Sequence, residues 1–392
     1  MPTTVLFAKK VTIPSRKADV IQSVNMASAF SLAGAEVLFY PGLHGGENTL
    51  TALLEEAAIP PEHARRWHSL PAASRGIYGL LFRLRVAAAY MSAKRCLAYA
   101  RDIMEASFLS RLRSVVKGER KLLFEMHNVL HLLHQDQAEK YNWRKTFRKE
   151  QAIFRSVDGL VATNAALVDA AKELFGYAGP VLVEWNGYNP ALFYPLPLFS
   201  EAAPWPDAEA PVELIYIGSF IPGKGVEELL DALAMLPPRF RLRVIGSGSP
   251  EAVSSVQKKV LSIPQGAQRI RLLGNIPQTQ LREACMGAHI AVLPQQEGTF
   301  FSPIKLNEYM ALGLPTVCAP LKIFAQQAHL MHRAKDNTPE FFAAAIAELA
   351  AQPGLARELR AGGIAASARH TWQARAERIL DFAAGLPGKG AS

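Results

Sequence analysis

The sequence predicts an α/β protein with two domains, each built on a parallel sheet between helices. Three observations predict this class. Short apolar runs of strand length alternate with longer segments of helical character, a pattern typical of parallel sheets. The alternation occurs in both halves of the chain, which a proline-rich stretch at residues 195–211 separates. The 392 residues are enough for two large apolar cores.

The elements follow in order along each half. In the first half, the apolar runs predict strands at residues 5–8, 36–40, 121–125, 160–163 and 181–185, with helices at 20–32, 76–91 and 140–154. In the second half they predict strands at 214–217, 242–245, 270–273, 290–293 and 316–319, with helices at 226–236, 302–313, 342–350, 355–368 and 372–386. We therefore expect two Rossmann-like domains facing a cleft, residues 1–195 and 196–371, with ligands beyond the carboxyl ends of the strands.

Composition bounds the class of protein. Hydrophobic residues make up 49% and charged residues 20% of the chain, as in globular proteins. No uninterrupted apolar run reaches 18 residues and the start of the chain lacks a signal-peptide pattern, so a cytoplasmic protein is expected. The three cysteines, Cys96, Cys285 and Cys318, are far apart, which disfavours a disulfide framework or a zinc site. Cys318 is expected in a buried strand.

Positive charge is concentrated in the first half. The net charge is +9, and residues 65–121 hold 13 basic residues against 3 acidic ones. Such a patch indicates an anionic partner: a membrane surface, an anionic glycan or nucleic acid. No nucleic-acid-binding motif is present, which disfavours the last of these.

Residues 76–91 carry two apolar stripes on a helical wheel. Arg83 and Arg85 flank them. Two interpretations stay open: a core helix of a Rossmann-like domain, or a basic amphipathic helix on an anionic membrane surface such as the inner face of the cell membrane. One stripe consists of Ile77, Leu80, Leu81, Leu84, Ala88 and Met91, and the other of Tyr78, Phe82 and Val86.

The segment S-P-I-K-L-N-E-Y-M-A-L-G-L-P at residues 302–315 predicts a phosphate-binding helix start. Ser302 suits the N-cap, Pro303 the first turn and Gly313 the C-terminal stop. Free N–H groups and the helix dipole at such a start favour phosphate. Lys305 would add charge for the phosphate, and Glu308, three residues on, would accept hydrogen bonds from ribose hydroxyls. A plain surface ion pair between the two is the alternative.

A glycine-rich loop precedes that segment in the same domain. Residues 218–225 read G-S-F-I-P-G-K-G between a predicted strand and a predicted helix, an arrangement that cradles phosphate with Lys224 as its cation. It is not a P-loop, because Gly225 stands where Ser or Thr is required. Two such loops in one domain predict a nucleotide-phosphate site.

These motifs resemble family 4 glycosyltransferases, and the likeness covers nearly the whole chain. It rests on Y-I-G-S-F-I-P-G-K-G, R-V-I-G-S-G, L-L-G-N-I-P and S-P-I-K-L-N-E-Y-M-A-L-G-L-P-T-V, with F-E-M-H-N, V-E-W-N-G-Y-N-P and H-T-W elsewhere. The resemblance implies the GT-B architecture and a retaining glycosyltransferase, of hexosyltransferase type, that uses a nucleotide-diphosphate sugar as donor substrate and no metal or other cofactor. It also implies a first domain for the acceptor and a second for the donor, with a final helix at 372–392 packing back on the first.

The resemblance carries roles to matching positions. It implies His127 and Lys224 as catalytic residues, and Lys305 is added as a third catalytic candidate by hypothesis. Where the family usually has an arginine, Ser219 stands here, and Lys305 is the local substitute. Phe300 replaces an expected glutamate, for which Glu297 is a neighbouring alternative. The implied donor contacts are Gly218, Ser219, Gly246, Ile276, Phe301, Ser302, Pro303, Ile304 and Glu308.

Other polar residues of the first half receive more limited roles. Glu125 is expected either to orient His127 or to finish its strand. His131 and His134 lie three residues apart without a third ligand of fitting spacing, which disfavours metal binding. Asn186 and Gly187 fit a turn of the family, in which Asn189 replaces the usual aspartate.

The expected acceptor is a glycan or lipid-linked molecule of cell-envelope or exopolysaccharide synthesis. The donor base and sugar are left open. A catalytically silent nucleotide-sugar-binding protein and a GT-B-fold nucleotide-sugar epimerase remain the alternatives, the first because Ser219 and Phe300 stand where charged residues are expected.

Overall fold

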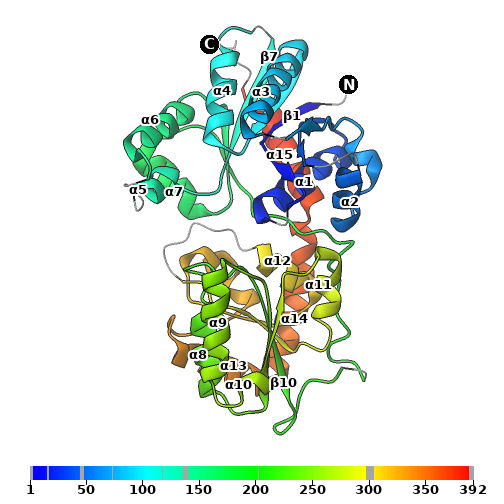
Figure 1. Cartoon of the computed structure of the whole chain (residues 1–392), viewed down its shortest axis with the longest axis vertical. Helices are drawn as coiled ribbons and strands as arrows, with labels where there is room; N and C mark the ends of the chain where they lie inside the picture. The colour runs from blue at the N-terminus through cyan, green and yellow to red at the C-terminus, as the bar shows by residue number, and fades with distance from the viewer. Residues whose placement is uncertain are drawn as a thin grey trace. The chain divides into compact units, whose positions relative to one another are not determined.

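The structure is a computed structural model that describes residues 3–15, 17–44, 48–72, 74–116, 118–135, 140–201, 203–296 and 304–387. It contains two compact units (Figure 1). The first comprises the chain up to Gly187 together with the segment that starts at Thr371. The second runs from Tyr188 to His370. That the units face a cleft stays a prediction.

The first unit is built on a six-stranded parallel sheet in the order β3-β1-β6-β7-β8-β9. Successive residues of a strand point to opposite faces, so Leu6 and Ala8 enter one apolar core while Val5 and Phe7 enter the other. The strands are β1 Thr4–Ala8, β3 Glu36–Phe39, β6 Arg95–Ala100, β7 Glu119–Met126, β8 Gly159–Ala162 and β9 Val181–Val183.

Helices cover both faces of this sheet. The core on one face includes side chains of α1 (Ala18–Leu32), α2 (Asn48–Glu56) and α15 (Trp372–Gly385), and α1 packs against α15. The core on the other face takes its helical side chains from α3 Arg75–Ser92, α4 Ile103–Arg113, α6 Trp143–Phe154 and α7 Ala165–Phe175. The short helices η1 Pro61–Ala64 and α5 Leu130–Gln135 complete the unit.

The first unit also contains a separate three-stranded parallel sheet in the order β2-β4-β5, with β2 Thr12–Ile13, β4 Gly42–Leu43 and β5 Leu70–Pro71. Tyr78 of α3 links this small sheet to the helix, because its hydroxyl donates hydrogen bonds to the carbonyls of Val11 and Tyr40 at 2.9 and 3.1 Å. A Cβ at Gly42 would lie 2.9 Å from the Tyr78 ring, so only glycine fits this approach.

The second unit repeats the design with a six-stranded parallel sheet in the order β12-β11-β10-β13-β14-β15. Its strands are β10 Val212–Ile217, β11 Phe240–Ile245, β12 Ile270–Gly274, β13 Ile290–Leu293, β14 Thr316–Cys318 and β15 His332–Arg333. Its helices are α8 Val226–Met235, α9 Pro250–Ser262, α10 Gly266–Arg269, α11 Gln278–Ala284, α12 Ile304–Leu312, η2 Lys322–Leu330, α13 Pro339–Ala350, α14 Pro353–Ser367 and η3 Ala368–His370.

The predicted fold class is confirmed, and the differences concern single elements. β6 has a central place in its sheet but was not predicted, because its sequence R-C-L-A-Y-A contains no β-branched residue. The two-residue strands of the small sheet are too short to show a period. The predicted helix 140–154 starts later, at Trp143, where the Asn142 side chain caps it by accepting from Lys145 N at 3.0 Å. Cys318 is fully buried in β14, as expected.

Candidate functional site

The predicted phosphate loop follows β10 at the carboxyl edge of the second sheet. The order of the strands reverses there, since β11 and β12 lie on one side of β10 and β13 and β14 on the other. Open parallel sheets bind ligands at such a switch point. The loops that carry Gly218, Gly246 and Ile276 follow β10, β11 and β12, so the fold brings these predicted donor residues to one edge.

Backbone contacts at this edge require glycine. Gly218 N donates to Ile245 O, and Gly246 N donates to Gly274 O, each at 2.9 Å. At Gly246, φ is +145° and a Cβ would lie 1.8 Å from Gly218 O. The two glycines therefore let main chain pack directly on main chain, which keeps side chains from filling this part of the edge.

The second half of the loop is fixed to the segment after β13. Gly225 has φ +73°, and a Cβ there would lie 1.6 Å from Pro294 O. The backbone N–H of Gln296 donates a hydrogen bond to Gly223 O at 3.0 Å. These contacts hold the loop across the switch point, and α8 begins directly after it at Val226.

Lys224 is half-buried in this loop. Burial disfavours its charged form and lowers the pKa of its amine to about 8. An anion such as a diphosphate would restore the lost stabilisation of the ammonium group. The position and the lowered pKa fit the predicted role of a cation for phosphate.

On α12 the two predicted ligand residues contact each other. Lys305 Nζ lies 2.5 Å from Glu308 Oε2, and the Glu308 side chain is only 1% exposed. The pair is therefore formed, but it is not the solvated surface pair considered as an alternative. The Tyr309 hydroxyl accepts from Ile217 N at 2.8 Å, which attaches α12 to the end of β10, next to Gly218.

Of the remaining predicted donor residues, the structure describes some and not others. Ser219 is half-buried after Gly218, and its carbonyl accepts from the Tyr216 hydroxyl at 3.3 Å. Ile276 is half-buried between β12 and α11, and Ile304 is the first residue of α12. Phe301, Ser302 and Pro303 lie outside the described residues, as do Phe300 and Glu297.

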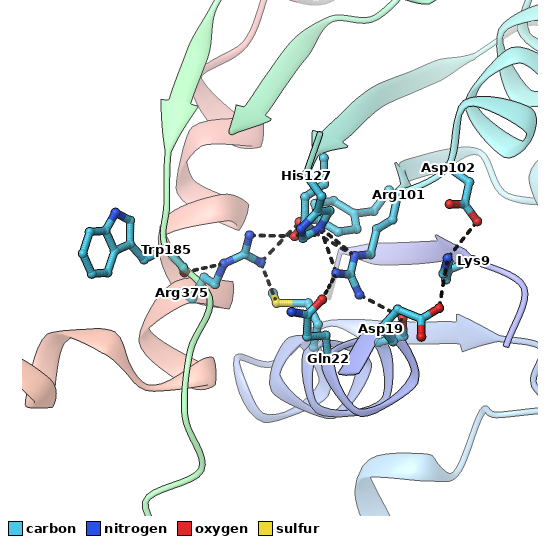
Figure 2. A network of polar contacts seen from close by, with 12 residues as sticks. Lys9, Asp19, Gln22, Arg101, Asp102, His127, Trp185 and Arg375 are labelled. Carbon is cyan, nitrogen blue, oxygen red and sulfur yellow. Dashed lines mark hydrogen bonds and ion pairs between the residues drawn. The ribbon is translucent and has the colours of Figure 1, made fainter. Parts of the chain in front are cut away.

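In the first unit, Glu125 is the centre of a buried network at the end of β7. Its carboxylate is 1% exposed, lies 2.9 Å from Arg375 Nη2 and 3.4 Å from Arg101 Nε, and accepts from the Tyr99 hydroxyl. Burial opposes ionisation of Glu125, but Arg101, Arg375 and His127 together hold its pKa well below the usual range. Figure 2 shows Arg375 reaching the network from α15.

His127 follows β7, and its ring nitrogen Nε2 has two neighbours (Figure 2). Glu125 Oε1 lies 2.7 Å away and Arg101 Nη2 2.8 Å away. Burial lowers the pKa of His127; Glu125 opposes this effect and Arg101 adds to it, leaving a pKa below the usual value and a neutral ring near pH 7. The side chain is 23% exposed, so solvent reaches part of it.

Further contacts extend the network at the carboxyl edge of the first sheet. Arg101 also donates to Ser23 Oγ and Gln22 Oε1, both on α1 and both at 2.8 Å. Lys9, directly after β1, lies 2.9 Å from Asp102 and 3.7 Å from Asp19 (Figure 2). The carboxyl ends of β1, β6 and β7 therefore present charged residues in fixed positions.

Sequence reasoning found His127 and Glu125 but missed their arginine partners. Arg101 directly follows β6, so recognition of that strand would have found it. Arg375 is 250 residues from Glu125 in sequence, and no local pattern indicates the contact. Glu125 is the last residue but one of β7, and its carboxylate lies 2.7 Å from His127 Nε2, a position compatible with both roles expected for it.

The other polar positions have structural partners. His131 Nδ1 lies 2.8 Å from Glu150 Oε2, and His134 Nδ1 lies 2.8 Å from the Thr146 hydroxyl. No group of three or more metal-ligating side chains occurs among the residues that the structure describes. A Cβ at Gly187 would lie 2.6 Å from Trp372 N, so this glycine lets the chain pass close to the start of α15.

Comparison with known proteins shows that part of the chain is similar to glycosyl transferases. Residues 211–352 match the family of group 1 glycosyl transferases. A D-inositol 3-phosphate glycosyltransferase of Segniliparus rotundus is 28% identical over 183 residues, which cover 42% of this chain and 38% of that protein. A phosphatidyl-myo-inositol mannosyltransferase of Propionibacterium freudenreichii is 27% identical over 46% of this chain and 45% of its own length. The chain thus matches less than half the length of these curated relatives.

Solved structures extend the likeness to the whole chain. The Anabaena protein Alr3699/HepE in complex with UDP has a TM-score of 0.70 and 16% identity over 98% of this chain and 100% of that chain. The sucrose-phosphate synthase of Thermosynechococcus elongatus has a TM-score of 0.69 and 19% identity over 97% of both chains. The fold is therefore the predicted GT-B type, and the match to group 1 glycosyl transferases lies within the second unit.

Proposed function

We propose that the protein is a retaining glycosyltransferase that moves a hexose from a nucleotide-diphosphate sugar to a glycan or lipid-linked acceptor without a metal cofactor. The observation that carries the proposal is the carboxyl edge of the second sheet. Within the segment matched to group 1 glycosyl transferases, Gly218, Gly246 and the half-buried Lys224 converge there. In the cell, the product would belong to envelope or exopolysaccharide synthesis.

The donor diphosphate binds at this edge in the proposed reaction. Lys224 neutralises the charge that develops on the leaving diphosphate, and the fixed backbone dipoles of the loop add to this effect. Lys305, now held by Glu308, would supply the second cation in place of the arginine that Ser219 replaces. Because Alr3699/HepE is solved with UDP, a UDP-sugar is the first donor to test.

His127 is the proposed contact of the first unit with substrate. Its neutral ring and partly exposed side chain suit a hydrogen bond to a hydroxyl of the sugar or acceptor. Arg101 and Glu125 position the ring from behind. Retention without a clear protein nucleophile fits attack on the face from which the diphosphate leaves.

We also propose that the protein works as a peripheral protein on an anionic membrane surface in the cytoplasm. The supporting observation is the outer side of α3, which carries the exposed side chains of Ile77, Leu80 and Leu84. Around the helix axis, Arg83 and Arg85 flank this apolar stripe on its two sides. No helix among the described residues is long and apolar enough to span a membrane.

The test is a thermal-shift screen with UDP, GDP, ADP, CMP and dTDP and their common sugars, followed by turnover with membrane extracts as acceptor source. At 100 times the dissociation constant, a ligand stabilises the fold by about 2.7 kcal/mol. We expect a selective shift that Glu308→Ala removes, and a turnover that Lys224→Ala abolishes and Lys305→Ala lowers. Full turnover in Lys305→Ala would refute its role, and donor binding without turnover on any acceptor would favour a silent binding protein.

A further inference from the structure

A pocket of about 570 Å³ lies in the first unit along α3. Arg85, Ala88 and Ser92 of the helix form one wall, and the segment from Trp67 to Leu70 forms the other. It contains none of the residues assigned above to donor or acceptor. Its function is therefore open.

The pocket is polar and cationic. Its lining includes Arg85, His68 and Ser69, all exposed, and no acidic residue. Within the described parts of the chain, no hydrogen bond or ion pair occupies these three side chains. Tyr40, stacked on His68 with ring centroids 5.9 Å apart, completes the floor. Burial raises the pKa of Tyr40, and the positive charge of Arg85, which lines the same pocket, opposes this effect.

The adjacent face of α3 is apolar and exposed. Ile77, Leu80, Leu84 and Met91 are 58%, 61%, 58% and 52% exposed, and their spacing puts them on one side of the helix. Tyr78, Phe82 and Val86 are buried on the opposite side. The stripe of Tyr78, Phe82 and Val86 therefore enters the core, as the core-helix interpretation expects, while the other stripe faces outward and leaves a membrane contact as a prediction.

The pocket and the exposed stripe adjoin each other. Ala88 lines the pocket and continues the stripe one turn after Leu84, while Arg85 follows Leu84 directly. A molecule with an anionic head beside an apolar chain matches this arrangement. A lipid in a bilayer on which α3 lies presents the two together.

We propose that this pocket binds the phosphate head group of an anionic membrane lipid while the exposed stripe of α3 enters the bilayer interface. Arg85 pairs with the phosphate, and His68 and Ser69 donate hydrogen bonds to it. Leu80, Leu84 and Met91 contact the acyl chains. The inference rests on the proposed membrane location but not on transferase activity.

Co-sedimentation with phosphatidylcholine vesicles, with and without phosphatidylglycerol, tests the pocket. Arg83 is the matched control, because it is exposed on the same helix but does not line the pocket. We expect Arg83→Gln to weaken binding to phosphatidylglycerol vesicles about fivefold, as one surface charge does. Arg85→Gln loses a charged hydrogen bond as well and should weaken it about fifty-fold. Equal losses of affinity in the two variants would refute the role of the pocket in lipid binding. If the wild-type protein bound neither kind of vesicle, the proposed membrane location would be refuted as well.

A soluble probe separates a lipid from free phosphate. Dihexanoyl phosphatidylglycerol below its micelle concentration should bind the wild type and lose affinity in both Arg85→Gln and Leu84→Ser. Inorganic phosphate should bind much more weakly and be insensitive to Leu84→Ser. Equal affinity for phosphate and the short-chain lipid would overturn the assignment to a lipid.

Discussion

Lys224 carries its charge in a half-buried position, and burial lowers its pKa to about 8. The folded pKa is thus below the ordinary lysine value, so the charged form is destabilised by folding. The folded state therefore gains stability as the pH rises from about 8 toward that ordinary value. Ligand binding has the opposite dependence, because a diphosphate requires the ammonium form.

We expect the affinity for the nucleoside diphosphate to fall about tenfold between pH 7 and pH 9, as a group with this pKa loses its proton. Isothermal titration with UDP at both pH values measures the change. In Lys224→Arg the charge persists at both pH values, so the fall should disappear. The same fall in Lys224→Arg would assign the titration to another group.

Glu125 is a buried carboxylate whose low pKa stabilises the first unit. The stability it contributes is present above the ordinary glutamate pKa and is lost as the pH falls through the lower folded value. Its two arginine partners would face a neutral amide in Glu125→Gln. Breaking one side of such a buried pair costs about 3–5 kcal/mol.

We therefore expect Glu125→Gln to lower the free energy of unfolding by about 3 kcal/mol in urea at pH 7. The exposed pair of Arg95 and Glu119, with side chains 82% and 72% exposed, supplies the control. Arg95→Gln should change the free energy of unfolding by less than about 1 kcal/mol. Similar effects of the two substitutions would show that the buried network adds no stability.

The loop between β10 and α8 depends on glycine geometry at its last residue. Gly225 combines a positive φ with a Cβ position 1.6 Å from Pro294 O. Gly274 also has a positive φ, +66°, but nothing lies within 4 Å of its Cβ position. The two positions therefore separate backbone strain from steric overlap.

We expect Gly274→Ala to lower the free energy of unfolding by about 1–2 kcal/mol, because a residue with a Cβ is strained in the left-handed backbone conformation. Gly225→Ala must also displace the loop from Pro294, so it should cost more and reduce UDP affinity at least about tenfold. Urea denaturation and titration with UDP measure the two effects. If UDP affinity were unchanged in Gly225→Ala, the loop would not form the phosphate site.

Helix α15, near the end of the sequence, is part of the first unit. α15 supplies Arg375 to Glu125, and Arg378 pairs with Glu184 at 2.5 and 2.7 Å. Lys121 Nζ donates to Ala383 O at 2.7 Å. The first unit is thus assembled from segments at both ends of the sequence.

We expect a chain that ends at residue 370 to have a strongly destabilised first unit, since it exposes an apolar core and leaves Glu125 without Arg375. Differential scanning calorimetry should show the transition of the first unit lowered by more than about 10 °C, as a loss of several kcal/mol implies. The transition of the second unit, Tyr188–His370, should persist. The 392-residue chain with Arg378→Gln, which loses one partly exposed ion pair, is the control and should keep both transitions.

Local patterns determined much of this protein. Alternating apolar runs predicted the two parallel sheets, and the spacing around Gly218, Lys224 and Glu308 predicted which sheet edge holds the candidate phosphate site. Such signals are readable because a buried strand, a glycine turn and a helix end each depend on a few consecutive residues.

Tertiary structure alone decided which distant groups meet. The burial of Glu308, the arginines around Glu125 and the outward face of α3 depend on packing and on contacts between residues far apart in sequence. A sequence shows which side chains carry charge or apolar surface. The packed chain determines their neighbours and their exposure to water, and these set the pKa values and the surfaces on which the proposed function rests.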